Sequence, residues 1–271
     1  MIALQSCISA HVRRYAARAY ILKKGGARNN RTPSLGMQKY EVSLKLTKRL
    51  ALIASYIEKD SNVIDVGTDH GLIPVYLAQN DIAKNIIAAD INEAPLDAAR
   101  KNAAKYNVQD KIKFVMTSGL DGIGREVDTV VIAGMGGENI AGILQNTPWL
   151  KLQNTKLILQ PQTRIEILCR WLGDNGYNIR DAALTHESSR FYIVIIAGVC
   201  ISDTQKIYHS EIDLYSLLVK KRDPFIESFL DDLIIKTKKT AGNSSKFGSN
   251  EFLKKFNELL KLKEECLNCQ K

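Results

Sequence analysis

A glycine-rich segment with acidic side chains has the spacing expected of a nucleoside-binding turn. The segment is Asp65-Val66-Gly67-Thr68-Asp69-His70-Gly71, and it ends a short apolar run that predicts a buried strand. Glycines between a strand and a helix let a ligand approach the backbone, and the helix offers free amide donors at its first turn. Asp90 follows 23 residues after Gly67, at the end of the next predicted strand. A carboxylate at that position of a doubly wound sheet reaches the ribose hydroxyls of an adenosine.

The same acidic side chains discriminate between two adenosine cofactors. A dinucleotide-binding turn has the pattern G-x-G-x-x-G, whereas this turn reads Gly-Thr-Asp-His-Gly. Asp69 would repel a pyrophosphate, and carboxylates at Asp65, Asp69 and Asp90 suit a ligand that carries a sulfonium and an ammonium group. The pattern therefore favours S-adenosylmethionine over NAD. A purely structural role for Asp65 and Asp69, as caps of the turn, is the alternative.

Two further glycine-containing segments follow predicted strands. Ser118 and Gly119 come after the third strand, where the adenine edge of the cofactor is expected to be read. Gly134-Met135-Gly136-Gly137 comes after the fourth strand, where the transferable methyl group would emerge. Glycines there leave room for a flat base and present backbone groups to its edge. A tight strand-to-helix turn is the structural alternative for this segment.

These segments lie in a regular alternation of predicted strands and helices. Strands are predicted over 62–66, 86–91, 112–116, 129–133 and 156–159. Helices are predicted over 43–57, 72–79, 94–106 and 164–172, and one more helix is predicted to follow Gly137 and to end at about residue 145. Such alternation indicates a parallel sheet that is covered on both faces. Two further runs, 177–185 and 191–199, predict a closing antiparallel pair. That hairpin separates methyltransferase sheets from nicotinamide-binding ones.

The predicted fold class is therefore α/β, a class I (Rossmann-like) S-adenosylmethionine-dependent methyltransferase sheet with a closing antiparallel hairpin. Apolar residues at helical spacing over about 209–239 and 249–266 predict a C-terminal helical, coiled-coil-like appendage. Pro224 is expected to kink or restart the first of these two segments. The expected organisation is a basic extension over 1–36, a methyltransferase domain over 37–201 and a helical RNA-binding appendage over 202–271.

The positive charge is concentrated at the N-terminus. The formal net charge is +9, but residues 1–36 hold seven of the 38 basic residues and no acidic one, so residues 37–271 carry 31 basic against 29 acidic groups. Nucleic-acid binding must therefore be argued from local clusters. The extension has the composition of an organelle transit peptide. It equally fits an upstream start codon wrongly chosen, because Met37 immediately precedes a predicted helix.

Cysteine usage and hydropathy exclude other classes of protein. The five cysteines do not suit a disulfide framework, and Cys266 and Cys269 form a lone C-x-x-C with no second pair to complete a zinc site. No run approaches the roughly 18 to 20 apolar residues that a membrane span needs. We therefore expect a cytoplasmic protein that binds no metal and no membrane.

Four motifs together resemble the bacterial TrmK family over about residues 42–199. In chain order they are Leu46–Leu50, the segment from Asp65 to Gly71, Ile132–Gly137 and Leu157–Pro161. TrmK enzymes are tRNA (adenine-N1)-methyltransferases that act at position 22, near the D-arm junction, and the family carries a C-terminal coiled-coil-like domain. The resemblance places Gly134–Gly137 near the target base. It implies cofactor contacts for Asp65, Gly67, His70, Asp90, Asn92, Ser118 and Gly119.

Three positions depart from the pattern of the family. Ser118 stands where many relatives have Asp, Gln162 replaces a frequent Asn, and Ile193 replaces a common acidic residue. The departure at Ser118 predicts that adenine is recognised there through a hydroxyl or through backbone amides. The other two departures concern the pocket for the base. For His70, packing against the following helix is the alternative to a cofactor contact.

The remaining predictions concern catalysis and RNA. Asp69 is the predicted catalytic residue, which would stabilise the positive charge that spreads over N1 and N6 of adenine or accept an N6 proton. Arg49 is predicted to reach a phosphate or the cofactor carboxylate, with a solvated surface position as the alternative. Lys220, Lys221 and Arg222 are predicted to grip tRNA phosphates, with a solvated face as the alternative.

Other functions also suit parts of the sequence. A class I methyltransferase sheet accepts many substrates, so another RNA or a small molecule is an alternative acceptor. A nucleotide-dependent oxidoreductase and a non-catalytic RNA-binding protein are the alternatives from other classes.

Overall fold

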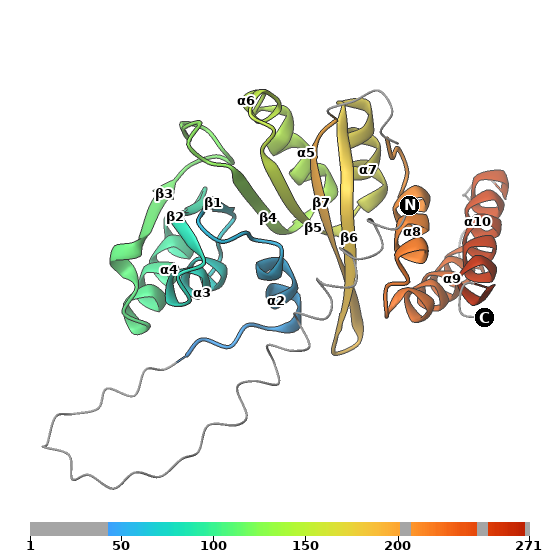
Figure 1. The fold of residues 1–271 in the computed structure, drawn as a ribbon. Helices are drawn as coiled ribbons and strands as arrows, with labels where there is room; N and C mark the ends of the chain where they lie inside the picture. The colour runs from blue at the N-terminus through green and yellow to red at the C-terminus, as the bar shows by residue number, and fades with distance from the viewer. Residues whose placement is uncertain (1–42, 201–206, 243–248, 269–271) are drawn as a thin grey trace, which may run out of the picture. The chain divides into compact units, whose positions relative to one another are not determined.

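A seven-stranded sheet forms the centre of the structure (Figure 1). The structure is a computed structural model and describes residues 43–200, 207–242 and 249–268. The strand order is β3-β2-β1-β4-β5-β7-β6. The first five strands are parallel, β7 is antiparallel to β5, and β6 is antiparallel to β7. The strands are β1 (Ser61–Val66), β2 (Ala83–Asp90), β3 (Ile112–Met116), β4 (Thr129–Gly136), β5 (Lys156–Thr163), β6 (Tyr177–Glu187) and β7 (Arg190–Val199). The predicted class I methyltransferase fold with its closing hairpin is confirmed.

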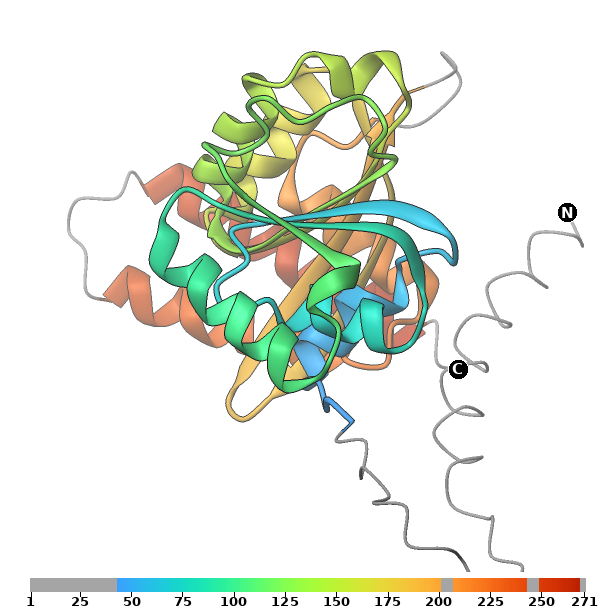
Figure 2. The ribbon, with the colours of Figure 1, turned by 90° about the vertical axis from the view of Figure 1, so that its left-hand side faces the viewer.

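Both faces of the sheet are covered by helices, as the apolar strands require (Figure 2). These helices are α2 (Lys48–Ser55), α3 (Leu72–Gln79), α4 (Glu93–Lys105), α5 (Gly137–Gln145), α6 (Trp149–Leu152) and α7 (Ile165–Asp174), with a short 3-10 turn at Gln109–Lys111. Successive strand residues point to opposite faces. Val131 accordingly joins the core beneath α2 and α3, whereas Val130 and Ile132 join the core beneath α5 and α7.

The first described helix starts later than predicted. The prediction was a helix from Ser43, but α2 begins at Lys48, because the Thr47 side chain accepts a hydrogen bond from the Leu50 amide. The amide of Leu44 donates instead to Gln79 Oε1 on α3, at 3.0 Å. This contact with a distant helix keeps the chain before Thr47 out of α2.

Strand β4 runs three residues beyond its predicted end at 133. Its last part pairs irregularly with β5, with Ala133 opposite Gln160, Met135 opposite Pro161 and Gly136 opposite Thr163. Gly134 has a φ of 82°, a conformation that favours glycine. Gly134, Met135 and Gly136 are therefore the bulged end of β4, and Gly137 begins α5, so the alternative of a separate strand-to-helix turn does not apply.

In the described part of the chain after the hairpin there are three helices, where two helical segments were predicted. They are α8 (Glu211–Lys221), α9 (Ile226–Gly242) and α10 (Ser249–Asn268). The helix is interrupted between α8 and α9 beside Pro224, as expected. Leu214 and Leu218 on α8 share one hydrophobic core with Leu168 and Leu172 on α7. Lys263 on α10 lies 3.1 Å from Glu227 Oε1 and 2.7 Å from Asp231 Oδ2 on α9. The helical region is thus joined to the sheet through a common core.

None of the helices described here combines the length and apolar character needed to cross a bilayer. The N-terminal extension over 1–36 lies outside the described residues.

The shared core predicts that the helical region and the sheet unfold together. Replacing the fully buried Leu218 with Ala should lower the free energy of unfolding by about 2 to 5 kcal/mol, because it removes apolar contacts and leaves a cavity. Urea denaturation is followed by fluorescence of Trp149 and Trp171, which lie in the sheet domain, and by circular dichroism. Both transitions should shift together. Leu253→Ala, at an exposed position of α10, is the control with a small effect. A separate, earlier loss of helical signal would contradict the prediction.

Candidate active site

Four strand ends lie side by side at one edge of the sheet. Strands β3, β2, β1 and β4 are parallel neighbours in that order, so their carboxyl ends meet at the same edge. This edge carries the turn after β1, Asp90 at the end of β2, Ser118 just beyond β3, and Gly134 in the bulged end of β4. The structure therefore brings together the segments that were predicted to bind a nucleoside and a base.

The turn after β1 requires glycine at two positions. Gly67 has a φ of 74°, and a Cβ atom there would lie 2.2 Å from the Met135 methyl group. Gly71 has a φ of 63°, and a Cβ atom there would lie 2.7 Å from that of Ala99 on α4. The amides of Gly67 and Thr68 both donate to Ala89 O on β2, at 2.8 and 3.0 Å. The turn is thus fixed by neighbouring strands and helices.

Asp65 is a carboxyl group buried beneath this turn, with 7% of its surface exposed. The Thr68 hydroxyl donates to Asp65 Oδ2 at 2.7 Å. The pKa of Asp65 is raised from 3.8 to about 6, chiefly by burial and also by the charge of Asp90, while the Thr68 hydrogen bond and the charge of Arg49 oppose the rise. A cationic ligand near this position would stabilise the ionised form.

Asp90 and Asn92 form the next part of the site. The backbone amide of Asn92 donates to Asp90 Oδ1 at 2.9 Å, which orients this half-buried carboxylate. Asn92 is the exposed residue before α4, and its side chain makes no capping hydrogen bond to that helix. Asp90 thus ends β2 at the edge where a ribose contact was predicted, and Asn92, for which the resemblance implied a cofactor contact, follows just after it.

Two exposed apolar side chains that the sequence analysis missed flank Asp90. Ile91 is 63% exposed and Met116 is 62% exposed, and Met116 is the register partner of Asp90 on β3. Large apolar side chains at the ends of adjacent strands offer a surface to a purine ring. The sequence contained one signal for Ile91, which is an apolar residue directly after Asp90 at the end of a predicted strand.

Ser118 and Gly119 complete the nucleoside side of the edge. The amide of the preceding Thr117 donates to Asp90 O at 2.9 Å, which holds this segment against β2. Ser118 is exposed, and its carbonyl oxygen accepts a hydrogen bond from the Asp121 amide at 3.1 Å. Gly119 has a φ of 60°, and a Cβ atom there would lie 3.1 Å from Ile143 on α5. The segment is thus a fixed turn beside the proposed ribose carboxylate.

Arg49 points into the site rather than into solvent. Its Nη1 donates to Gln160 Oε1 at 2.9 Å, and its Cζ lies 5.6 Å from the centre of the Tyr192 ring. A Cβ atom at Gly134 would lie 3.6 Å both from Arg49 Nη1 and from Gln162 Nε2. Of the two alternatives drawn from the sequence, the structure therefore favours a side chain at the site over a solvated one.

Gln160 is a third residue whose place in the site the sequence analysis missed. Its side chain is fully buried, and its two polar atoms bond to Arg49 and to Pro161 O. The signal in the sequence was a polar residue at the end of the apolar run Leu157–Leu159.

Asp69 and His70 are exposed on the turn. The Asp69 side chain is 81% exposed and that of His70 is 58% exposed, with 3.6 Å between Asp69 Oδ2 and His70 Nε2. Asn102 on α4 donates to the His70 carbonyl oxygen at 2.9 Å, so the backbone of His70 is anchored. Because the ring of His70 is more than half exposed, burial against α3 does not account for this residue.

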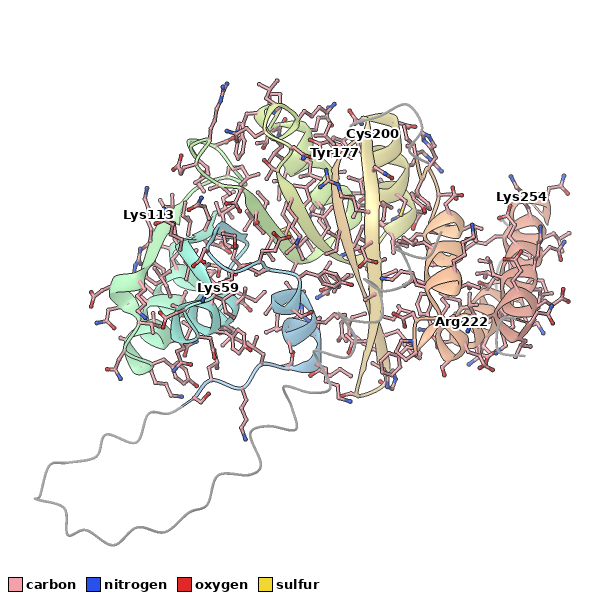
Figure 3. The ribbon with its side chains drawn as sticks, in the orientation of Figure 1. Lys59, Lys113, Tyr177, Cys200, Arg222 and Lys254 are labelled. Carbon is pink, nitrogen blue, oxygen red and sulfur yellow. The ribbon has the colours of Figure 1, made fainter. Side chains whose placement is uncertain are left out.

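The basic cluster at the end of α8 is split by an ion pair. Lys221 Nζ pairs with Asp181 on β6 and also donates to Ala182 O at 2.8 Å, and its side chain is only 22% exposed. Lys220 and Arg222 are exposed. Figure 3 shows Arg222 on the helical region. We therefore correct the prediction for Lys221, whose ammonium group joins α8 to the sheet, and keep Lys220 and Arg222 as candidates for phosphate contacts.

Within 43–200, 207–242 and 249–268, no group of three or more His, Cys, Asp or Glu side chains is arranged to hold a metal ion. Cys266 is buried, and Cys269 lies outside the described residues.

Known proteins share this fold and these motifs. Residues 46–195 match the family described as "Methyltransferase domain". The curated "tRNA (adenine(22)-N(1))-methyltransferase" of Bacillus subtilis (strain 168) is 34% identical over 155 residues, 57% of this chain and 65% of that protein. The chain thus matches slightly less than two thirds of that relative's length.

Two solved structures are similar over most of the chain. M. capricolum TrmK in complex with S-adenosyl-homocysteine has a TM-score of 0.69 and 25% identity, and covers 82% of this chain and 99% of its own. B. subtilis TrmK, an M1A22 tRNA methyltransferase, has a TM-score of 0.63 and 26% identity, and covers 83% and 98%. The resemblance to the TrmK family that the sequence motifs indicated is confirmed.

The buried Asp65 predicts a stability that depends on pH. Because its pKa is raised on folding, the folded state holds the proton more tightly, and stability falls as pH rises from about 4 to about 6. The loss corresponds to about 3 kcal/mol above pH 6. Asp65→Asn should therefore raise the free energy of unfolding by about that amount at pH 8 and by well under 1 kcal/mol at pH 4, as measured by urea denaturation without cofactor. An equal gain at both pH values would show that the charge of Asp65 is not the cause.

Proposed function

The chain belongs to the methyltransferase-domain family, and on this premise we propose that it transfers a methyl group from S-adenosylmethionine to N1 of an adenine in tRNA, at position 22 near the D-arm. The observation that carries the proposal is the row of four strand ends. There, carboxylates and fixed glycine turns lie beside a bulged strand end with Arg49 next to it. The name of the B. subtilis relative supports the choice of substrate.

The residues at the strand ends fit the cofactor. Asp90 would accept hydrogen bonds from the ribose hydroxyls, with Asn92 beside it, and Ile91 and Met116 would enclose the adenine ring. Ser118 and Gly119 would read the adenine edge. The negative charges of Asp65 and Asp90 suit a cationic cofactor, and the backbone of Gly67 lets it approach the turn. When bound, the cofactor supplies an electrophilic methyl group on a sulfonium.

The bulged end of β4 would receive the target base. Gly134 and Gly136 would present backbone groups without side-chain bulk there, beside Met135, whereas Gly137 is buried at the start of α5 and does not fit the predicted base contact. Arg49 and Gln162 lie beside Gly134, and the Thr163 hydroxyl lies beside Gly136. The N1 atom of adenine is unprotonated at neutral pH, so no strong base is needed before the transfer. These residues would therefore act mainly by aligning the base with the methyl group.

We assign Asp69 the role of stabilising the charge that develops on the base. The positive charge of the methylated ring spreads over N1 and N6, and a carboxylate within hydrogen-bond reach would stabilise it or accept an N6 proton. The side chain of Asp69 is exposed at the turn after β1, and β1 is the neighbour of β4, whose bulged end carries Gly134. His70 lies beside it and would contact the cofactor.

The tRNA itself would be held outside this edge. N1 lies on the pairing edge of adenine, so the base must be unpaired or swung out of its stack before it enters. Lys220 and Arg222 are exposed on the helical region and would contact phosphates. We propose a cytoplasmic location for this activity, because the substrate is a tRNA.

The first test measures the product directly. Unmodified tRNA is incubated with the full chain and S-adenosylmethionine, and the nucleosides are analysed by mass spectrometry. We expect N1-methyladenosine at position 22, mapped by the stop it causes in reverse transcription. Asp90→Ala should weaken cofactor binding and reduce the yield. The proposal fails if another nucleoside is methylated, or if the protein binds NAD(H) and transfers no methyl group.

The second test concerns Asp69. Asp69→Asn should lower the rate of methyl transfer by about 100-fold, since it removes a charge that acts only in the transition state, and should leave cofactor affinity and the KM for tRNA unchanged. Asp110→Asn is the control, because Asp110 is an exposed carboxylate before β3, at the opposite edge of the sheet. A wild-type rate for Asp69→Asn would remove Asp69 from catalysis.

A further inference from the structure

A pocket of about 390 Å³ lies between the start of α2 and the turn of the β6–β7 hairpin. It is lined by Arg49 and Arg190, by the hydroxyl side chains of Thr47, Ser188 and Ser189, and by the ring of Tyr192. We propose that this hairpin pocket binds a phosphodiester group of the tRNA strand next to the target adenine, an inference that rests on the proposed function.

Arg49 connects the hairpin pocket to the place of the target base. Its guanidinium donates to Gln160 and lies beside Gly134, while the same side chain lines the hairpin pocket. A guanidinium has five N–H donors in a planar fork that matches a phosphate. Among the described residues, no carboxylate forms an ion pair with Arg49. Its remaining donors thus suit an anion.

Arg190 supplies a second cation from a distant part of the chain. It is exposed at the first position of β7, opposite Glu187 across the hairpin turn. Ser188, in the two-residue turn of the hairpin, has a φ of 55°, in the left-handed region that residues with a side chain rarely adopt. Such a backbone conformation is typical of the tight turns that join two hairpin strands. Two arginines and three hydroxyl groups then face one space, which is the donor set that phosphate contacts use.

Glu187 also lines the hairpin pocket, and its charge has a local partner. Its Oε2 accepts a hydrogen bond from the Arg49 backbone amide at 3.4 Å, in the first turn of α2. A carboxylate at that end of a helix is stabilised by the helix dipole. Glu187 therefore fixes the helix that carries Arg49, and two guanidinium groups remain to meet the ligand.

The test compares two arginine variants of the full chain. Arg190→Gln should raise the Kd for tRNA about 10-fold at moderate salt and reduce the slope of log Kd against log salt concentration by about one. Affinity for S-adenosylmethionine should not change. Arg125→Gln is the matched control, because Arg125 is an exposed arginine in the segment before β4, at the opposite edge of the sheet. Urea denaturation verifies that both variants are folded.

The position of the contact is tested with tRNA that carries a single neutral methylphosphonate on one side or the other of the target adenosine. At one of these linkages the substitution should weaken binding to the wild type but not weaken binding to Arg190→Gln further. The inference is overturned if Arg190→Gln binds tRNA as Arg125→Gln does, or if its affinity for the cofactor falls instead. It is also overturned if, at every linkage, the loss of tRNA affinity from the methylphosphonate and the loss from Arg190→Gln add in full. Should the wild-type protein methylate no tRNA, the proposed function fails; should it methylate tRNA while any of these results is found, only the hairpin pocket is refuted.

Discussion

The carboxyl group of Asp65 is buried near the end of β1, the middle one of the five parallel strands. The rest of the site is arranged around it. Its ionised form has one short hydrogen bond, from Thr68, and a more distant favourable charge in Arg49. Burial and Asp90 act against ionisation. A fold selected for stability alone would place an apolar residue here, as at the neighbouring Ile64 and Val66. The acidic group is understandable if a cationic ligand completes the site, because that ligand would offset the cost of burying the charge.

The cofactor side and the base side of the site adjoin each other. The Met135 methyl group, on the bulged end of β4, occupies the space that a side chain at Gly67 would need. The bulge arises where Met135 pairs with Pro161 of β5, and the preceding residue, Gln160, accepts a hydrogen bond from Arg49. The turn after β1, the end of β4 and the Arg49 guanidinium therefore lie together, which suits a reaction in which two reactants must be aligned.

The sequence was sufficient for the strands and for the segments at their ends, because apolar runs bounded by glycines and acidic residues are local signals. It failed where a distant residue decides. The start of α2 depends on Gln79, which binds the Leu44 amide, and the length of β4 depends on pairing with β5. Lys221 looked like part of a basic cluster because its partner, Asp181, is 40 residues away. Arg190 becomes visible as a site residue only when the hairpin and α2 are seen together. Gln160 had one local signal, a polar residue after an apolar run, but its partner Arg49 lies 111 residues away.

Strand β6 joins the parts of the molecule that would have to act on one RNA. Tyr56 at the end of α2 donates to Asp181 Oδ2 at 3.3 Å, and Lys221 at the end of α8 binds the other oxygen of the same carboxylate. Burial, and then Asp181, raise the pKa of Tyr56, so the phenol keeps its proton and remains a donor. The amide of Leu184 donates to Asp223 Oδ2, between α8 and α9, at 3.0 Å. Helix α2, which carries Arg49, and helix α8, which carries Lys220 and is followed by Arg222, are therefore fixed to one strand. An RNA that contacts both would be recognised by the constant spacing between them, and the spacing would select which adenine reaches the end of β4.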